Sequence, residues 1–441
     1  MRKIVLLVSM FAIAANMMAA DHVMAATKHA PKQEVPATLN LSLQEAQDYA
    51  VAQNRSLKNA DLAVQKAYAT RWQTIASMLP SVDMSWAYQS MMGYEMNLGG
   101  MPIKMPDNGT LGITASVGIN GQAIVGALLN NTAIEMQKLN LEISEDNLRA
   151  SVKSSYASVL VLEDVVKLLD SSLKNIENLA AMTQRSVEVG AAEQTTADQI
   201  LVRVNTLKNN INANKRSTQL AINALKVLLN VPAETELTLT TQLSDMLSAE
   251  AIVALLGKEF VLENNLSYQT LAKNVELAKK NVHMAGWAYG PTVGVGYQYS
   301  EKDYFGKKEG FNMTPPNALS IQVSMPLWSS GKRAAGVVEK KIALEEARNT
   351  FEETADNLGI QNEQLRYNLQ NAYETYTNEQ ENMGVTQRVF DNTSLKFQQG
   401  VASNLDLVNA SNDLITAQST YVQAVLALVN AEVELEKFLN L

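Results

Sequence analysis

Residues 80–89 read PSVDMSWAYQ, and residues 291–300 read PTVGVGYQYS. In each stretch, apolar side chains alternate with polar or small ones after a proline, which is the period of a β-strand that has one apolar face. The two stretches align at a separation of 211 residues, so that their prolines and their two aromatic positions coincide. This recurrence indicates an internal duplication of the chain.

Two further segments show the same alternation, LGITASVGIN at 111–120 and LSIQVSMPL at 319–327. Each half of the chain therefore contains two predicted strands, and long loops rich in glycine, proline, asparagine and charge join them. We expect strands at 81–90, 110–120, 292–300 and 318–328, with the long loops at 91–109 and 301–318.

The predicted strands have the pattern of outer-membrane strands, which run for about ten residues, present one apolar face and carry aromatic residues at the membrane interfaces. Four such strands would leave open edges in lipid, where each unpaired backbone group costs several kcal/mol. Copies of the chain would therefore have to share a barrel. A four-stranded soluble sheet packed on helices is the alternative interpretation. The candidate membrane-interface aromatics are Trp86, Tyr88, Tyr297, Tyr299 and Trp328.

The rest of the chain is predicted to form long helices. No proline occurs between residues 107 and 231 or between residues 327 and 441, so continuous helix is permitted in both regions. Apolar and small residues there step by four and three alternately, a repeat typical of helices that stay in contact over many turns. The two clearest series are Ile200, Val204, Leu207, Ile211, Asn214, Thr218, Ala221, Leu225, Leu228 and Ala410, Leu414, Ala417, Tyr421, Ala424, Leu428, Ala431, Leu435, Phe438.

Each of these regions is interrupted once, by VEVGAAEQTTADQ at 187–199 and by FQQGVASNLDLV at 397–408. Glycine suits the C-terminus of a helix, and Thr, Ser or Asn can cap the helix that follows. Each region is therefore predicted to be a helical hairpin with its tip at Gly190 or Gly400. The predicted helices are 124–188 and 194–230 in the first hairpin, and 333–398 and 403–440 in the second.

The N-terminal sequence MRKIVLLVSMFAIAANMMAA has two basic residues before an apolar run and then small residues, which is the pattern of a secretory signal peptide. No later stretch is expected to be apolar enough for a membrane-spanning helix. We divide the chain into a signal peptide at 1–26 with cleavage between 20 and 26, a first repeat at 27–230, a linker at 231–250 that adds short strands or a helix, and a second repeat at 251–441.

The composition argues against several classes of function. The chain has no cysteine, and therefore neither disulfides nor a lipid-modified cysteine, and of its three histidines only His283 lies outside the N-terminal region. The net charge of −9 argues against a nucleic-acid partner. We find no paired carboxylates in an apolar setting, no glycine-rich phosphate loop and no nucleophile beside a histidine, so we expect no enzyme activity, no cofactor and no metal site.

The order of these parts resembles the TolC-type outer membrane efflux protein family over residues 40–441. LSLQEAQDYAVAQNRSLKNADLAVQKA at 41–67 is similar to the opening helix of the family, and MLPSVDMSWAYQ at 78–89 is similar to its passage from helix to strand. IQVSMPLWSSGKRAAGVVEKKIALEEAR at 321–348 is similar to its passage from strand into a long helix. The first repeat departs from this pattern, because NGQAIVGALL at 120–129 replaces a Gly-Gly-basic turn.

The resemblance implies a mainly helical fold with a small β part. Three chains would share a twelve-stranded transmembrane β-barrel, to which each contributes four strands, and their coiled-coil hairpins would form a periplasmic α-barrel tunnel. It further implies a passive exit duct of a tripartite efflux or type I secretion system in the outer membrane of a Gram-negative bacterium. Its partners would be a periplasmic adaptor protein, an inner-membrane transporter and outer-membrane lipid.

The resemblance also implies roles for residues at the hairpin tips. Adaptor contacts would fall on Gly190, Ala191, Gly400 and Val401, and the pore constriction would involve Asp406, Asn409, Thr196 and Asp198. Three copies of Asp406 around one axis would favour cations, whereas Asn409 stands where a second aspartate can occur in the family and weakens that expectation. Asp406 fits equally well as a helix N-terminal charge favoured by the helix dipole.

One other class of function fits the sequence. A secreted or periplasmic coiled-coil scaffold would bind partners without crossing a membrane, and extraction from cells without detergent would favour it.

Overall fold

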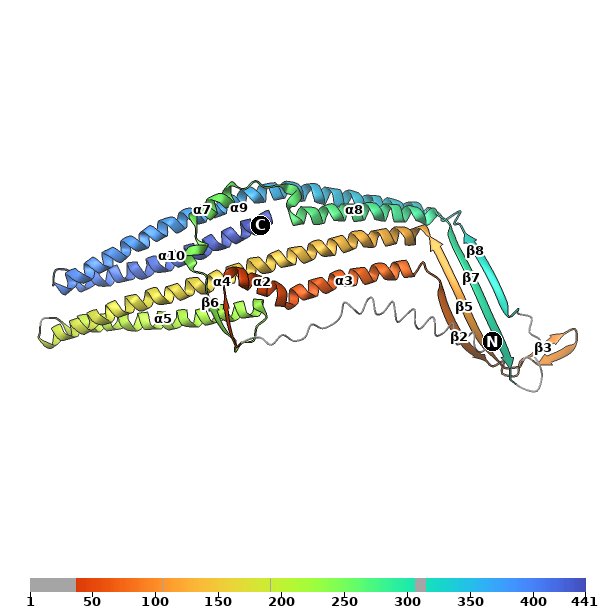
Figure 1. The fold of residues 1–441 in the computed structure, drawn as a ribbon, viewed down its shortest axis with the longest axis horizontal. Coiled ribbons are helices and arrows are strands. Elements are labelled where there is room, and N and C mark those ends of the chain that lie inside the picture. The colour runs from red at the N-terminus through yellow and green to blue at the C-terminus, as the bar shows by residue number, and fades with distance from the viewer. Residues whose placement is uncertain (1–36, 105, 191, 306–314) are drawn as a thin grey trace. The chain divides into compact units, whose positions relative to one another are not determined.

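The computed structural model describes residues 37–104, 106–190, 192–305 and 315–441 (Figure 1). The signal peptide expected at 1–26 lies outside the described residues. The described chain is mainly helical with a small antiparallel sheet, as the sequence predicted. It divides into two compact units, which we call the strand unit (residues 62–138 and 270–351) and the tip unit (residues 37–61, 139–269 and 352–441).

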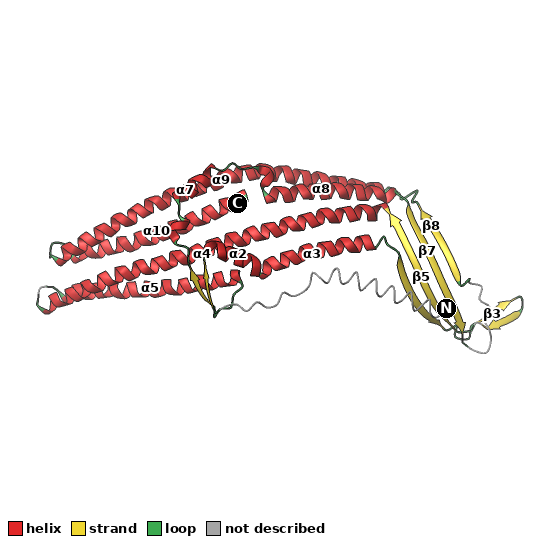
Figure 2. Cartoon of the chain, viewed as in Figure 1, coloured by secondary structure: helices red, strands yellow, loops and turns green. Residues whose placement is uncertain are grey.

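The strand unit contains a four-stranded antiparallel sheet of order β2-β5-β7-β8 (Figure 2). The strands are β2 (Ser81–Gln89), β5 (Asn108–Asn120), β7 (Thr292–Tyr304) and β8 (Asn317–Ser324). The central strands β5 and β7 pair along their whole length and run further toward the loops than predicted. Strand β8 ends four residues before the predicted 328, because Pro326 has no N–H group to continue a ladder.

The loop predicted at 91–109 contains a small hairpin that the sequence analysis did not identify. Strand β3 (Glu95–Leu98) pairs with β4 (Met101–Lys104) through a two-residue turn. Both turn residues, Gly99 and Gly100, have positive φ values of 63° and 93°. This conformation suits a type I′ turn, which matches the twist of a hairpin and strongly favours glycine.

Helices leave and enter the sheet of the strand unit at one end. Helix α3 (Arg55–Ala76) leads into β2, the short helix η3 (Trp287–Tyr289) follows α8 (Leu266–Gly286) and leads into β7, and α9 (Lys332–Gln398) follows β8. Helix α4 (Gly121–Glu188) starts directly after β5, three residues before the predicted start at 124. A Cβ atom on Gly121 would lie 2.1 Å from the Trp287 ring, so the indole occupies the space beside this junction.

The tip unit is built from the two helical hairpins. The first joins α4 to α5 (Gln194–Leu229), and the second joins α9 to α10 (Asn404–Leu439). The predicted boundaries agree with these helices to within about three residues, since the caps and the 3.5-residue repeat are both local signals. A cluster near the tips draws side chains from all four helices and includes Leu179, Leu207, Phe390 and Leu414.

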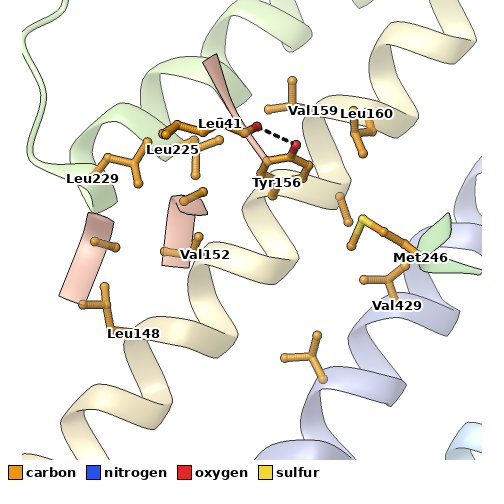
Figure 3. Close-up of a cluster of buried hydrophobic side chains, with 14 of the residues drawn as sticks. Leu41, Leu148, Val152, Tyr156, Val159, Leu160, Leu225, Leu229, Met246 and Val429 are labelled. Atoms are coloured by element: carbon orange, nitrogen blue, oxygen red, sulfur yellow. Dashed lines mark hydrogen bonds between the residues drawn. The ribbon is translucent and has the colours of Figure 1, made fainter. Parts of the chain in front are cut away.

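A second cluster lies where the linker meets the hairpins (Figure 3). Strand β1 (Thr38–Leu41) pairs in parallel with β6 (Glu236–Leu239), and the linker continues into α6 (Leu243–Met246) and α7 (Ala249–Gly257). Tyr156 of α4 is fully buried there. Its hydroxyl donates to the Leu41 carbonyl over 2.9 Å and accepts from the Thr241 N–H over 3.0 Å, so one side chain binds the chain at the C-terminal ends of both parallel strands.

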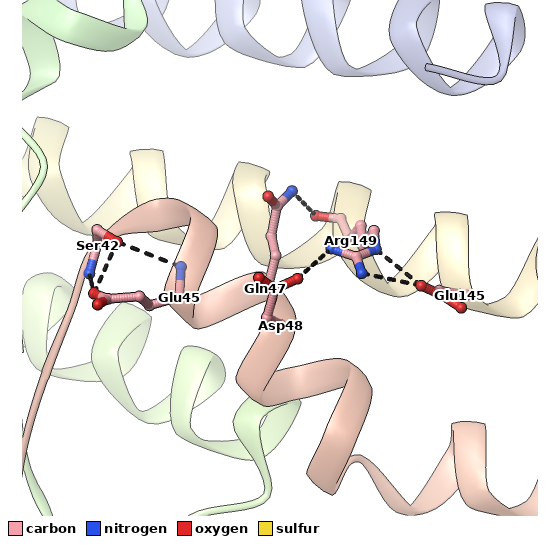
Figure 4. Close-up of polar contacts among 6 residues, drawn as sticks. All are labelled: Ser42, Glu45, Gln47, Asp48, Glu145 and Arg149. Atoms are coloured by element: carbon pink, nitrogen blue, oxygen red, sulfur yellow. Dashed lines mark hydrogen bonds and ion pairs between the residues drawn. The ribbon is translucent and has the colours of Figure 1, made fainter.

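Helix α2 (Leu43–Gln53) is fixed to α4 by polar contacts in the tip unit (Figure 4). Ser42 and Glu45 form a reciprocal capping box at its start. One guanidinium nitrogen of Arg149 lies 2.9 Å from the carboxylate of Asp48 and a second lies 3.0 Å from that of Glu145. These contacts orient the N-terminal segment on the first hairpin.

The expectation that no helix after the N-terminal segment could span a membrane needs correction. Residues Leu405–Leu439 are long and apolar enough by length and composition, with a mean hydropathy of 1.2 in their most apolar window. The apolar side chains of this helix include Leu414, Leu428 and Leu435, which are buried in the clusters of the tip unit. Its hydropathy therefore reflects packing against neighbouring helices.

Candidate functional site

The four-stranded sheet of the strand unit has two chemically different faces. Residues directly opposite each other across a ladder point to the same face, and alternate residues point to opposite faces. The apolar face carries Val82, Met84, Trp86, Tyr88, Leu111, Ile113, Ala115, Val117, Ile119, Val293, Val295, Tyr297, Tyr299, Leu319, Ile321 and Val323. The small-polar face carries Ser81, Asp83, Ser85, Ala87, Thr110, Gly112, Thr114, Ser116, Gly118, Gly294, Gly296, Gln298, Ala318, Ser320 and Gln322.

The apolar face is exposed on both edge strands. Met84 on β2 is 72% exposed, and Ile321 on β8 is 69% exposed. A chain in water would normally bury such a continuous apolar surface, so this face is built to meet an apolar phase or another apolar surface. The small-polar face has the opposite character. Its glycine, serine and threonine residues have short side chains, and the hydroxyl groups can form hydrogen bonds with water.

Four of the five predicted interface aromatics lie on the apolar face; Trp86 and Tyr88 are toward the loop end of β2, whereas Tyr297 is near the middle of β7. Trp86 is opposite Leu111 of β5, and Tyr299 is opposite Ile113. The Tyr297 hydroxyl donates to Asn317 over 2.7 Å. The fifth, Trp328, is exposed but lies beyond the end of β8, at the helix end of the sheet.

Two aromatic residues that the strand pattern did not identify lie at this helix end. Trp287 and Tyr289 form the short helix η3 just before β7, and both rings are about half exposed. The guanidinium carbon of Arg333 lies 5.3 Å from the centroid of the Tyr289 ring, a cation–π contact. Both belong to the WAY segment at 287–289, which lies just before the predicted strand at 292–300.

At the loop end of the sheet, Asp107 holds the start of β5 against the end of β2. Its carboxylate accepts hydrogen bonds from the Met91 N–H at 2.8 Å, the Ser90 hydroxyl at 2.9 Å and the Tyr88 hydroxyl at 3.0 Å. These bonds, the Met91 N–H first, lower the pKa of Asp107. The loop between β2 and β5 is therefore closed at its base.

The two hairpin tips share one backbone conformation. Gly190 and Gly400 have φ values of 75° and 72°, in the left-handed region that glycine adopts without strain. After Gly400, the Val401 N–H donates to the Lys396 carbonyl over 2.8 Å and satisfies an end of α9. Val401 is exposed, whereas Ala191, the other predicted adaptor contact, lies outside the described residues.

Asp406 acts locally as a helix cap. Its carboxylate accepts from the Ser403 N–H over 2.9 Å and the Ser403 hydroxyl over 2.7 Å, and its own N–H donates to that hydroxyl. These bonds, the hydroxyl first, lower the pKa of Asp406, so the side chain carries a negative charge at neutral pH. The structure thus supports the capping interpretation, while the carboxylate remains exposed.

The other candidates for the constriction lie on the first two turns of the two returning helices, α5 and α10. Asn409 is exposed on α10. Thr196 is half-buried on α5, and Asp198 is exposed, with its carboxylate accepting from the Gln194 amide over 2.9 Å. The role of these residues in a constriction stays a prediction.

A buried charge cluster in the tip unit escaped sequence reasoning. The Lys153 ammonium on α4 lies 2.9 Å from Glu432 and 2.7 Å from Glu436 of α10. Burial alone would lower the pKa of Lys153, but the two carboxylates outweigh it and raise that pKa. Burial raises the pKa of Glu432 more than Lys153 lowers it. The cluster therefore holds one ammonium group and two carboxylates in a largely buried position.

A second network ties α8 to α4 in the strand unit. Glu276 receives hydrogen bonds or ion pairs from Lys280 at 2.7 Å, Thr132 at 3.2 Å and Lys273 at 3.3 Å. The hydrogen bond from Lys280, with that from Lys273, lowers the pKa of Glu276 to about 2. The two lysine pairings are local i,i+3 and i,i+4 pairs of one helix, whereas the Thr132 contact joins residues 144 positions apart and has no local sequence pattern.

The described residues contain no group of three or more His, Cys, Asp or Glu side chains that could hold a metal ion. His283 lies in the last turn of α8.

Comparisons with known proteins agree with this arrangement. A sequence model of the outer membrane efflux protein family matches residues 47–231 and 259–441. The chain is 22% identical over 301 residues to the outer membrane efflux protein BepC of Brucella suis, covering 66% of this chain and 63% of that protein's length. It is also 22% identical over 427 residues to the probable efflux pump outer membrane protein TtgC of Pseudomonas putida, covering 90% of this chain and 83% of that protein.

The fold is similar to that of solved structures. The crystal structure of CusC, described for transmembrane channel formation, superposes with a TM-score of 0.73 at 16% identity, covering 93% of this chain and 98% of that one. At this identity the likeness concerns the fold alone.

Proposed function

This chain belongs to the outer membrane efflux protein family, and on that premise we propose that three copies of it form one passive exit duct through the outer membrane. Proteins of this family are channels and not enzymes. The observation that carries the proposal is the two-faced sheet, with its exposed apolar face and its thin small-polar face. The apolar face meets lipid, and the small-polar face lines a water-filled lumen.

The open edges of the sheet support a barrel shared among copies. Strands β2 and β8 each pair on one side only within the described chain, and an unpaired edge is not tolerated in lipid. Two copies would give eight strands, whose interior is just wide enough for side chains to fill. A duct needs a wider lumen, which twelve strands from three copies provide.

The connections of the strands set the orientation of the duct. All four strands join helices at one end and loops at the other. Export through the periplasm delivers the helices to the inner side of the outer membrane, and the loops at 90–107 and 305–316 then face the medium. Trp86 and Tyr88 lie at the outer interface in this arrangement, and Trp287, Tyr289 and Trp328 lie at the inner one.

The hairpin tips are the part of the duct that reaches toward the inner membrane. Exposed Val401, together with the open space around Gly190 and Gly400, supports a docking role for the tips toward a periplasmic adaptor protein and an inner-membrane transporter. The duct has no energy source of its own, so the transporter drives export. Three copies of the exposed Asp406 carboxylate at the narrow end would favour cations, while Asn409 adds no charge.

The first experiment is the native mass of the protein extracted by detergent from an outer-membrane fraction. A mass of three chains is the expected result. A monomer in the soluble fraction would contradict the duct and favour a periplasmic coiled-coil scaffold.

The tip docking is tested separately by Gly190→Trp and Gly400→Trp. Each adds a large side chain where a Cβ would meet no atom within 4 Å, and the matched control is Gly359→Trp on α9, which also has open space. We expect export to fall in the tip variants while the protein still reaches the outer membrane. Normal export from both tip variants would count against docking at these positions and leave the duct itself untouched.

A further inference from the structure

The loop between β2 and β5 has an unusual concentration of methionine. Of the 19 methionines in the chain, five lie between residues 91 and 105, in the sequence MMGYEMNLGGMPIKM. Methionine usually fills gaps in apolar cores, because its thioether is flexible and largely apolar. A loop that faces solvent has no apolar core, so gap filling does not explain the methionines found there.

Met92 is held in a conformation that methionine rarely adopts. It is 95% exposed and has a φ of 49°. Gly93 follows with a φ of 80°, and the Tyr94 N–H donates to the Met91 carbonyl over 2.9 Å, so the four residues form a type I′ turn. Asn, Asp or Gly normally takes the place of Met92, and a long side chain such as that of methionine costs about 1–2 kcal/mol there. Burial does not offset this cost, which points to a role for the side chain itself.

Met96 and Met101 lie on one face of the β3–β4 hairpin. The register pairs Met96 with Ile103 and Leu98 with Met101, so the two methionines are diagonal neighbours across the ladder. Such neighbours are about 7–8 Å apart, within reach of long side chains. Met101 is 73% exposed and Met96 is 36% exposed. Met92 precedes Met96 by four residues, on a loop whose base is closed by Asp107.

We propose that Met92, Met96 and Met101 form a thioether site for a soft monovalent metal ion, Cu(I) or Ag(I). Thioether sulfur is a soft, neutral ligand that selects such ions over Mg²⁺, Ca²⁺ or Zn²⁺. By strand alternation, Glu95 and Asn97 point to the face of the hairpin opposite the methionines. Their oxygen atoms, which favour hard cations, therefore do not belong to the thioether site. Methionine also retains its ligand character at any physiological pH and without a reducing environment, unlike a thiol.

The site belongs to a single chain, so it does not depend on the oligomeric state. Its place at the outer mouth of the duct rests on the proposed function, whereas metal binding by the hairpin does not. In the duct, three such sites would hold soft ions where the lumen opens to the medium.

The test uses the full-length protein in detergent and Ag(I), which has the ligand preferences of Cu(I) without its redox chemistry. Competition titration measures affinity and stoichiometry, and X-ray absorption identifies the bonded element. We expect one tight Ag(I) per chain with sulfur ligands. Loss of outer-shell partners alone commonly lowers metal affinity 10–100-fold. The variant M92L/M96L/M101L keeps the apolar volume but removes the sulfur ligands, so we expect its affinity for Ag(I) to fall about a hundredfold.

The matched control is M84L/M182L/M325L, which removes three other exposed thioethers. It should bind Ag(I) like the wild type, and Zn²⁺ in excess should not displace the ion. Equal Ag(I) affinity in the loop variant and the wild type would overturn the proposal, as would an equal loss in the control. Binding of an apolar dye to both wild type and loop variant, with no tight Ag(I), would instead assign the hairpin face to apolar contacts.

Discussion

Replacement of Tyr156 by phenylalanine tests how the short β1–β6 sheet is held on the first hairpin. The ring is fully buried and would keep its packing, so the change removes only the hydroxyl group. The two bonds lost are not equivalent. The Leu41 carbonyl keeps a second donor, the Thr240 N–H at 3.1 Å, whereas the Thr241 N–H loses its partner.

The expected cost follows from this asymmetry. Leaving a buried donor unsatisfied costs about 1–3 kcal/mol. Thr241 is half-buried, so water partly replaces the bond, and we expect a loss of about 1–2 kcal/mol in the local opening free energy. Since about 1.4 kcal/mol corresponds to a factor of ten, amide exchange at Thr241 and along β1 and β6 should accelerate about tenfold.

Hydrogen exchange followed by mass spectrometry measures this opening without unfolding the whole assembly. The control is Tyr49→Phe on α2, which packs against the same cluster but whose hydroxyl has no hydrogen bond among those found in the described chain. The control should leave exchange at Thr241 unchanged. Unaltered exchange in Tyr156→Phe, or the same acceleration in both variants, would refute the assigned role of the hydroxyl.

Three further predictions concern other parts of the molecule. Ile321→Lys puts a charge on the apolar face of the sheet and should cost about 2–4 kcal/mol if that face meets lipid, so the protein should be depleted from the outer-membrane fraction, whereas Gln322→Lys on the other face should assemble normally. Lys153→Met leaves two glutamates of α10 without their cation and should cost about 3–5 kcal/mol, seen as faster proteolysis of the tip unit; wild-type resistance would argue against the ion cluster. The pKa of Glu276 is about 2, below its ordinary value of 4.5, so its stabilising contribution is present above pH 4.5 and is lost as the pH falls toward 2. Thermal melts of Glu276→Gln should lack that part of the pH dependence, and identical profiles would count against it.

The helices were predictable because their signals are local. Proline-free length, a 3.5-residue repeat and a glycine at each tip located the hairpins to within a few residues. The strand ends were less predictable, because β5 and β7 extend by pairing with each other, a long-range effect that alternation within one segment does not reveal. The β3–β4 hairpin was missed since its strands are only four residues long and one of them contains a proline.

The candidate site divides in the same way. The apolar face and four of its aromatics followed from the alternation of residues. The cap formed by Ser403 and Asp406 follows a local sequence pattern, a serine with an acidic residue three positions later, which can be recognised from sequence. Only the charge of Asp406 was used in the prediction, and its pairing with Ser403 was not. The Lys153 cluster was not accessible, because its carboxylates come from the other end of the chain.

The central ladder of the sheet has a consequence for how the chain matures. Asn120 pairs with Thr292 and Asn108 pairs with Tyr304. The partner strand of β5 therefore lies about 170–200 residues further along the chain and is synthesised and exported later than β5. Until then only the β2–β5 ribbon exists, and an isolated two-stranded ribbon is marginal in water. Loop-closure entropy delays such distant pairing further. The helical hairpin between them, by contrast, needs only its own neighbours. We therefore expect the helices to form before the sheet, with the apolar strands β2 and β5 lacking their partner β7 during that interval.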